Sequence, residues 1–207
     1  MLPHDLFHQH ADRYAEQYAD QARYFPSFDR FLAQLPGDPP RVLELACGPG
    51  NATAYLLQHR PEIELLGWDL APRMIEIARE AHPGARFEVK AMQDTPELSG
   101  NWNGIFCAFG LPYLDREAVQ RLCHESSRLL EPGGVLYLSC MEDDYSASRW
   151  QGPSSGEGSQ IFMHYYREAT LRSYVQAAGL RVLSVDRLPG LTEDAPPDVM
   201  LVACKTG

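Results

Sequence analysis

From residue 41 onward, short apolar runs alternate with stretches that have helical periodicity. The apolar runs have the length and composition of buried strands: "RVLELA", "IELLGWDL", "RFEVKAM", "GIFCAFG" and "GGVLYLSC". Amphipathic stretches between them predict helices over residues 52–60, 72–81 and 116–130. Because parallel strands are joined by crossover helices and are buried on both faces, the pattern predicts an α/β fold with a mainly parallel, doubly wound sheet.

The pattern changes after the fifth apolar run. Residues 142–166 are rich in Gly, Pro, Ser and acidic residues with little periodicity, which predicts a lid-like insertion. A helix is expected over residues 167–180, closed by Gly179. The last two strands, 181–188 and 198–205, are joined by a segment too short for a covering helix, so we expect them to be antiparallel.

The first 40 residues differ from the rest of the chain. They are rich in aromatic residues at helical spacing and end in the helix-breaking sequence "PGDPP". We interpret residues 1–40 as an N-terminal helical arm that belongs to the same domain as residues 41–207. The arm either packs on the domain or covers a ligand, and the pattern alone favours neither role.

Charge narrows the range of partners. Eighteen basic and 28 acidic residues give a net charge of −10, and the two lysines, Lys90 and Lys205, are far apart. Because phosphate binding requires clustered Lys and Arg, this balance argues against nucleic acid and anionic membranes as partners. The length of 207 residues suits one large domain or two very small ones. We expect a monomer or homodimer that acts on a small molecule.

Cysteine usage and the N-terminal sequence indicate the compartment. The five cysteines are widely spaced without a C-x-x-C pair, which argues against a zinc or redox site and fits a reducing compartment. The start, "MLPHDLFHQH", lacks the apolar core of a signal peptide, and no run reaches about 18 apolar residues. His4 and His8 have no nearby third ligand, so we expect no metal site. These features predict a cytoplasmic protein.

The stretch "VLELACGPGNATAYLL", residues 42–57, is the first candidate for chemistry. In an open α/β sheet, ligands bind beyond the carboxyl ends of the strands, and this stretch forms the turn after the first strand. Gly48 and Gly50 remove Cβ atoms where a ligand or the next helix must approach closely. Such a turn can also serve packing alone, so it remains ambiguous by itself.

Acidic residues near three strand ends make the turn more informative. Asp69 ends the second strand, 19 residues after Gly50, where a carboxylate either binds both hydroxyls of a ribose or caps a helix. Glu44 lies in an otherwise apolar strand, where its burial is costly unless a cation offsets the charge. Gln93 and Asp94 follow the third strand, where they either reach an adenine edge or cap a helix.

Four segments in this order resemble the successive motifs of class I S-adenosylmethionine-dependent methyltransferases: "VLELACGPGNAT", "GWDLAPRMIEIA", "AMQDTPEL" and "NGIFCAFGLPYL". The resemblance covers residues 41–140, and residues 180–205 are similar to the sixth and seventh strands of that family. It implies a Rossmann-like, seven-stranded sheet, mostly parallel with an antiparallel last strand. It also implies S-adenosylmethionine as the cofactor. One departure is Ala46, where the family often has a glycine.

The resemblance assigns roles to individual residues. Glu44 would lie near the methionine ammonium, and Asp69 would bind the ribose hydroxyls. The family often contributes a tyrosine from its N-terminal arm, which implies Tyr14 or Tyr18, four residues apart on one helix face. The other implied contacts line the methionine portion, the adenine or the methyl path: the backbone at Ala46, Gly48 and Gly50, then Leu70, Met74, Gln93, Asp94, Ala108 and Phe109.

The methyl acceptor is less defined than the cofactor. "AFGLPYL" lacks the "NPPY" or "DPPY" sequence of many nucleic-acid amino-methyltransferases and fits in-line transfer to a small-molecule acceptor. A general base is needed only if the acceptor must lose a proton. The candidates are Tyr113, the acidic residues 142–144, and His164, Tyr165 and Tyr166, and the sequence does not choose among them. His164 can equally be a strand residue that only forms hydrogen bonds.

Two other classes of protein share parts of this pattern. An NAD-dependent oxidoreductase has the same turn and ribose acid, but Thr53 replaces the third glycine of G-x-G-x-x-G, and no obvious Tyr-x-x-x-Lys motif is present. Glu44 would also repel a pyrophosphate. A non-catalytic, methyltransferase-like protein would keep Glu44, Gly48, Gly50 and Asp69 for cofactor binding without turnover.

Overall fold

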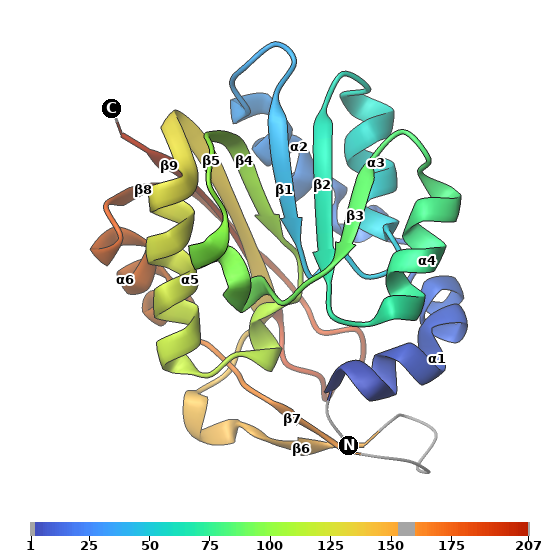
Figure 1. The fold of residues 1–207 in the computed structure, drawn as a ribbon. Coiled ribbons are helices and arrows are strands. Elements are labelled where there is room, and N and C mark those ends of the chain that lie inside the picture. Colours follow the sequence, from blue (N-terminus) through green and yellow to red (C-terminus); the bar gives the residue numbers. More distant parts are fainter. Residues whose placement is uncertain (1–2, 153–159, 207) are drawn as a thin grey trace.

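Seven strands form the central sheet of this computed structural model, which describes residues 3–152 and 160–206. Their order is β3-β2-β1-β4-β5-β9-β8, and β9 runs antiparallel to the other six strands (Figure 1). This arrangement confirms the predicted Rossmann-like α/β fold. The strands are β1 (Arg41–Leu45), β2 (Glu64–Asp69), β3 (Arg86–Val89), β4 (Trp102–Cys107), β5 (Leu130–Met141), β8 (Leu180–Leu188) and β9 (Asp198–Lys205).

Helices cover both faces of the sheet because side chains alternate along each strand. On β5, Val135 and Tyr137 belong to the apolar core under one set of helices, whereas Leu136 and Leu138 belong to the core under the other. The first set is α2 (Phe25–Gln34), α3 (Asn51–His59) and α4 (Pro72–Ala81), and the second is α5 (Arg116–Leu129) and α6 (Glu168–Ala177).

The N-terminal segment divides into two parts with different packing. Helix α2 belongs to the core, where Phe28 and Phe31 make edge-to-face contacts with Phe106 of β4. Helix α1 (Pro3–Gln17) instead lies against α4 at the carboxyl ends of the parallel strands (Figure 1). The two are linked through the short 3₁₀ turn η1 (Ala22–Tyr24).

The expected lid-like insertion contains regular structure as well as loop. After β5 come the 3₁₀ turn η4 (Tyr145–Ala147) and β6 (Arg149–Gln151), which pairs antiparallel with β7 (Ile161–Met163). This small two-stranded sheet lies near α1 at the same end of the main sheet (Figure 1). Two other 3₁₀ turns, η2 (Met92–Glu97) and η3 (Leu111–Tyr113), follow β3 and β4.

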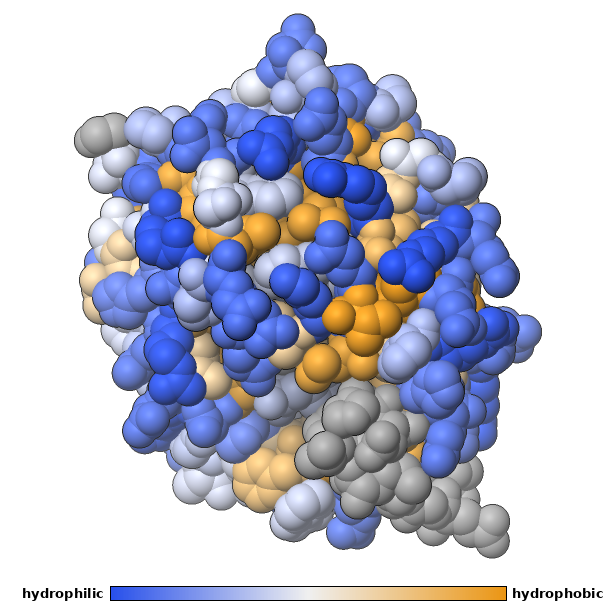
Figure 2. Space-filling model, in the orientation of Figure 1, coloured by the Kyte–Doolittle hydropathy of each residue, from blue (hydrophilic) through white to orange (hydrophobic). Residues whose placement is uncertain are grey.

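The face of the molecule seen in Figure 2 is mostly hydrophilic. Apolar residues form several patches on it, in the upper half as well as right of the centre. Among the helices of the described ranges, none combines the length and apolar character needed to cross a membrane.

Candidate functional site

The turn after β1 has an unusual backbone. Ala46, Gly48 and Gly50 all have positive φ angles, of 53°, 55° and 88°. Glycine adopts this conformation freely, but an alanine there costs about 1 kcal/mol. A Cβ on Gly110 would come within 3.0 Å of the Ala46 Cβ, so Gly110 leaves room for the turn. The left-handed backbone at Ala46 explains why the resembling family favours glycine at this position.

The Asp69 carboxylate links the turn after β1 to the start of α4. One of its carboxylate oxygens accepts a hydrogen bond from the Gly48 N–H at 3.0 Å, and the other accepts from the Ala71 N–H at 2.8 Å. Burial raises the pKa of Asp69, and the backbone hydrogen bonds act in the opposite direction. Ala71, not Asp69, occupies the N-cap position of α4. Asp69 therefore positions the backbone and also presents its carboxylate to the adjoining cavity.

Glu44 is a buried carboxylate behind the same turn. Its side chain is 2% exposed and accepts a hydrogen bond from the Thr53 hydroxyl of α3. Burial raises the pKa of Glu44 to about 8, which the Thr53 hydrogen bond partly opposes. Among the residues that the structure describes, no Lys, Arg or His forms an ion pair with Glu44. A cation near this turn would therefore stabilise the ionised form.

A cavity opens in front of the turn, with about 660 Å³ of space including its open mouth. It joins the carboxyl ends of β1, β2 and β4 to α1. Tyr113, a candidate base, also lines it. The cavity brings together eight of the residues expected to bind the cofactor: Tyr14, Ala46, Gly48, Asp69, Leu70, Met74, Ala108 and Phe109.

The other expected cofactor residues lie outside this lining. Glu44 is buried behind the turn, and a Cβ on Gly50 would meet the His82 ring at 2.7 Å, so Gly50 serves helix packing. Gln93 lines a separate groove between η2 and α5. Asp94 accepts a hydrogen bond from the Ala91 N–H at 3.1 Å and thus caps η2. Tyr18 follows α1 and lines the second cavity described below.

Three lining residues were not foreseen: Phe7, Lys90 and Met92. Lys90 directly follows β3, and its ammonium lies 5.1 Å from the centre of the Trp68 ring. Lys90 and Met92 both follow the end of β3, so their position after a strand was the signal in the sequence. Phe7 lies two helical turns before Tyr14 and contacts it edge to face, so the helical spacing of the arm carried that signal.

A second cavity lies between α1 and the β6–β7 pair. It contains about 1110 Å³ of space including its open mouth. Phe7, Tyr14 and Tyr113 line both cavities, so the two meet at these three aromatic residues. The further lining comes from Leu6, His10, Arg13, Gln17, Tyr18, Gln151, Gly152, Ile161 and Met163.

Tyr113, His164 and Tyr165, three of the candidates for a general base, lie in different surroundings. Tyr113 lies at the junction of the cavities, but burial raises its pKa well above the usual value, so it is a neutral phenol at pH 7. His164 stacks on Tyr145 and lines neither cavity, and burial lowers its pKa. Tyr165 is 1% exposed and accepts a hydrogen bond from Gln151 at 2.6 Å. Of these three residues, only Tyr113 lines either cavity.

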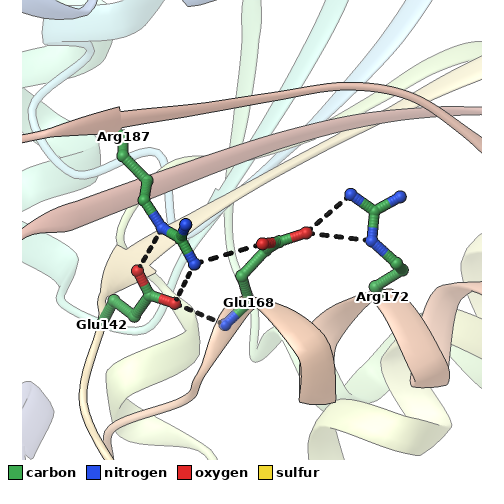
Figure 3. Close-up of polar contacts among 4 residues, drawn as sticks. All are labelled: Glu142, Glu168, Arg172 and Arg187. Atoms are coloured by element: carbon green, nitrogen blue, oxygen red, sulfur yellow. Dashed lines mark hydrogen bonds and ion pairs between the residues drawn. The ribbon is translucent and has the colours of Figure 1, made fainter.

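The acidic residues after β5 are engaged in structural contacts. Glu142 pairs with Arg187 of β8 at 2.6 Å and accepts a hydrogen bond from the Glu168 N–H at 2.8 Å (Figure 3). The Arg187 guanidinium holds the pKa of Glu142 below its usual value. Asp144 caps η4 and pairs with Arg167 at 3.2 Å. Within the described residues, no cluster of three His, Cys, Asp or Glu side chains is arranged to hold a metal ion.

Fold and site together define the class of protein: an α/β protein with a cofactor cavity at the carboxyl ends of its parallel strands, next to a second cavity. The carboxylate of Asp69 suits a ribose, and the buried Glu44 suits a cationic group more than a pyrophosphate.

Comparisons with known proteins agree with this class. Residues 42–134 match the family model described as a methyltransferase domain. A trans-aconitate 2-methyltransferase of Rhodopseudomonas palustris is 36% identical over 185 residues, which cover 86% of this chain and 64% of that protein. A tRNA N(3)-methylcytidine methyltransferase of Drosophila melanogaster is 29% identical over 199 residues, covering 77% of this chain and 58% of that protein.

Solved structures agree with the sequence relatives on the fold. A 1,6-didemethyltoxoflavin-N1-methyltransferase of Burkholderia thailandensis superposes with a TM-score of 0.74 at 22% identity, covering 99% of this chain and 87% of that one. The comparisons confirm the resemblance of this chain to the class I S-adenosylmethionine-dependent methyltransferases that was found in the sequence. The chain spans 22% to 64% of the length of three trans-aconitate 2-methyltransferases that it matches.

Proposed function

We propose that this protein transfers a methyl group from S-adenosylmethionine to a small-molecule acceptor. The observation that carries the proposal is the junction of the two cavities at Phe7, Tyr14 and Tyr113. A transferase must hold two ligands so that their reacting atoms meet, and two cavities that share one wall provide this arrangement.

The first cavity fits S-adenosylmethionine. Asp69 presents a carboxylate for the ribose hydroxyls, and Leu70 and Met74 supply apolar surface for the adenine. Among the described residues, no cationic side chain pairs with the buried Glu44. This carboxylate therefore suits the methionine ammonium. When bound, S-adenosylmethionine supplies a methyl group that its sulfonium makes electrophilic.

The chain's own residues would position the acceptor and exclude water. Phe7 and Tyr113 contact each other edge to face, with ring centres 5.3 Å apart, and form an apolar wall at the junction. Alignment of two reactants can contribute roughly 7–11 kcal/mol to lowering a barrier. Because Tyr113 stays protonated at neutral pH, we propose that it donates a hydrogen bond to the acceptor and does not act as a base.

The insertion contributes the opposite wall of the second cavity through Gln151, Ile161 and Met163. This placement supports the expected lid-like role of the insertion, and we propose that these three residues contact the acceptor. The names of two similar proteins support a small molecule: trans-aconitate for one and 1,6-didemethyltoxoflavin for the other. A third relative is named for tRNA, and the net charge of −10 makes a nucleic-acid acceptor less favourable for this chain.

A screen for methyl transfer tests the proposal. Purified protein and S-adenosylmethionine are incubated with fractionated metabolite pools, and S-adenosylhomocysteine is quantified by mass spectrometry. We expect at least one small-molecule fraction to raise product above the level seen with the Asp69→Asn variant. Product that stays at the variant's level in every fraction, although the protein binds the cofactor, would favour the non-catalytic alternative.

A further inference from the structure

Helix α1 presents two faces with different tasks. Ala11 is fully buried against Met74 and Ala71, and Asp12 pairs with Arg73 of α4 through two hydrogen bonds, at 3.2 and 2.7 Å. This face attaches the helix to the domain. The adjacent face lines the second cavity and carries Leu6, His10, Arg13 and Gln17 at helical spacing. We call these four residues the α1 wall.

The α1 wall is cationic in an acidic protein. Among the residues that the structure describes, Arg13 and His10 are the basic side chains that line the second cavity, and no Asp or Glu lines it. The rest of the lining is apolar, aromatic or amide in character. In a chain with net charge −10, a cavity wall that carries arginine and histidine without an acid favours an anionic ligand.

Asp12, the acid next to Arg13 in the sequence, pairs with Arg73 of α4. Among the residues that the structure describes, no carboxylate forms an ion pair with Arg13. The cavity side of α1 thus offers a guanidinium whose planar donors match a carboxylate in a two-point contact.

We infer that the acceptor is a small carboxylic acid, anchored by its carboxylate on Arg13 with its reacting atom at the Phe7–Tyr14–Tyr113 junction. This inference rests on the proposed function and names the substrate class for it. Arg13 lines only the second cavity, so the anchored carboxylate lies away from the cofactor cavity. His10, where the backbone of α1 departs from helical geometry, and Gln17 supply further polar contacts on the same wall.

The test uses a panel of aliphatic and aromatic mono-, di- and tricarboxylates, each with its primary amide as the neutral match. Binding to protein saturated with S-adenosylhomocysteine is measured by calorimetry, and transfer by release of S-adenosylhomocysteine. We expect at least one acid to bind and react while its amide does not. Arg13→Gln should raise KM for that acid by at least about tenfold, with a smaller change in kcat. Arg13→Lys should restore part of the loss.

Controls separate this inference from the proposed function. Arg60→Gln removes the same charge from a residue that pairs with Glu62 and lines neither cavity, and it should leave KM unchanged. Arg13→Gln should leave the Kd for S-adenosylhomocysteine within about twofold of the wild-type value. The inference is overturned if no acid binds, if the amides serve as well as the acids, or if Arg13→Gln weakens cofactor binding in place of acceptor binding. Failure of the wild-type protein to bind the cofactor would instead defeat the proposed function.

Discussion

The first cavity joins strand ends and a backbone turn to side chains of α1 and α4, whereas the second lies mainly between side chains of α1 and β6–β7. At the first cavity, positive φ angles and hydrogen bonds to Asp69 define the surface. At the second, the α1 wall and the side chains of the insertion define it. A backbone surface depends on a few obligatory residues, but a side-chain surface can change its chemistry by substitution. The first cavity thus suits a fixed cofactor and the second a variable acceptor.

The largest expected effect is at Asp69. Asp69→Asn keeps the size of the side chain but can accept only one of the two backbone hydrogen bonds and loses the charge. We expect the Kd for S-adenosylhomocysteine to rise at least about tenfold, equivalent to about 1.4 kcal/mol, as measured by calorimetry. Asp12→Asn, which removes an acid from the α1–α4 contact, is the matched control and should leave that Kd nearly unchanged. An unaltered Kd in Asp69→Asn would show that the hydrogen bonds between Asp69 and the backbone are not needed for cofactor binding.

Ionisation of Glu44 should make the stability of the protein depend on pH. Its pKa is raised to about 8 in the folded protein, against 4.5 for an ordinary glutamate. Between these values the folded protein retains a proton that the unfolded chain has released, so stability falls as pH rises from about 4.5 to 8. Glu44→Gln lacks this loss and should gain on the wild type by up to about 1.4 kcal/mol per pH unit across that window.

Denaturant unfolding of both proteins from pH 4 to pH 9 measures this difference. The two curves should lie close together near pH 4, which serves as the internal control, and separate with rising pH. Calorimetry should show weaker binding of S-adenosylhomocysteine by Glu44→Gln, because this variant lacks the charge that we propose stabilises the methionine ammonium. Curves that stay parallel across the pH range would mean that Glu44 is ionised in the folded protein without cost.

A smaller effect is expected at Ala46. Ala46→Gly relieves the left-handed backbone and should stabilise the protein by about 0.5–1 kcal/mol. Ala54→Gly, at an exposed position of α3, is the matched control and should destabilise by about 1 kcal/mol. Thermal unfolding distinguishes the two signs. A loss of stability in both variants would show that the turn stores no strain at Ala46.

The smallest effect is expected at the base of the insertion. Arg187 of β8 joins Glu142 and Glu168, the residues on either side of the insertion (Figure 3). Because its side chain is exposed, Arg187→Gln should lower Tm less than Ala46→Gly raises it. Raising the salt concentration should lower the wild-type Tm toward that of the variant. A large fall in Tm would indicate that the insertion is held by charge more than by packing.

The sequence revealed the first cavity more completely than the second for a physical reason. The turn after β1 requires small residues and a following acid, so Gly48 and Asp69 can be recognised from the sequence alone. Strand alternation likewise revealed the sheet, and the short 189–198 connection predicted the antiparallel pairing of β8 with β9. The residues at which strands begin and end were less predictable. Strand β3 ends at Val89, and β5 begins at Leu130, which pairs with Trp102.

The second cavity depends on contacts between segments far apart in the chain. Phe7 and Tyr113 meet at a centre-to-centre distance of 5.3 Å, although 106 positions separate them. Nothing in the local pattern of the insertion indicates that β6 and β7 pair, because each strand has only three residues. The same limit applies to Asp94, which was expected to reach an adenine or to cap a helix, and which caps η2.

Titration with S-adenosylhomocysteine in a calorimeter, compared with titration with NADH, tests the central claim most directly. We expect one site per chain with a micromolar Kd for S-adenosylhomocysteine and no heat of binding for NADH. Binding of NADH, with no binding of S-adenosylhomocysteine at millimolar concentration, would contradict the assignment of the first cavity.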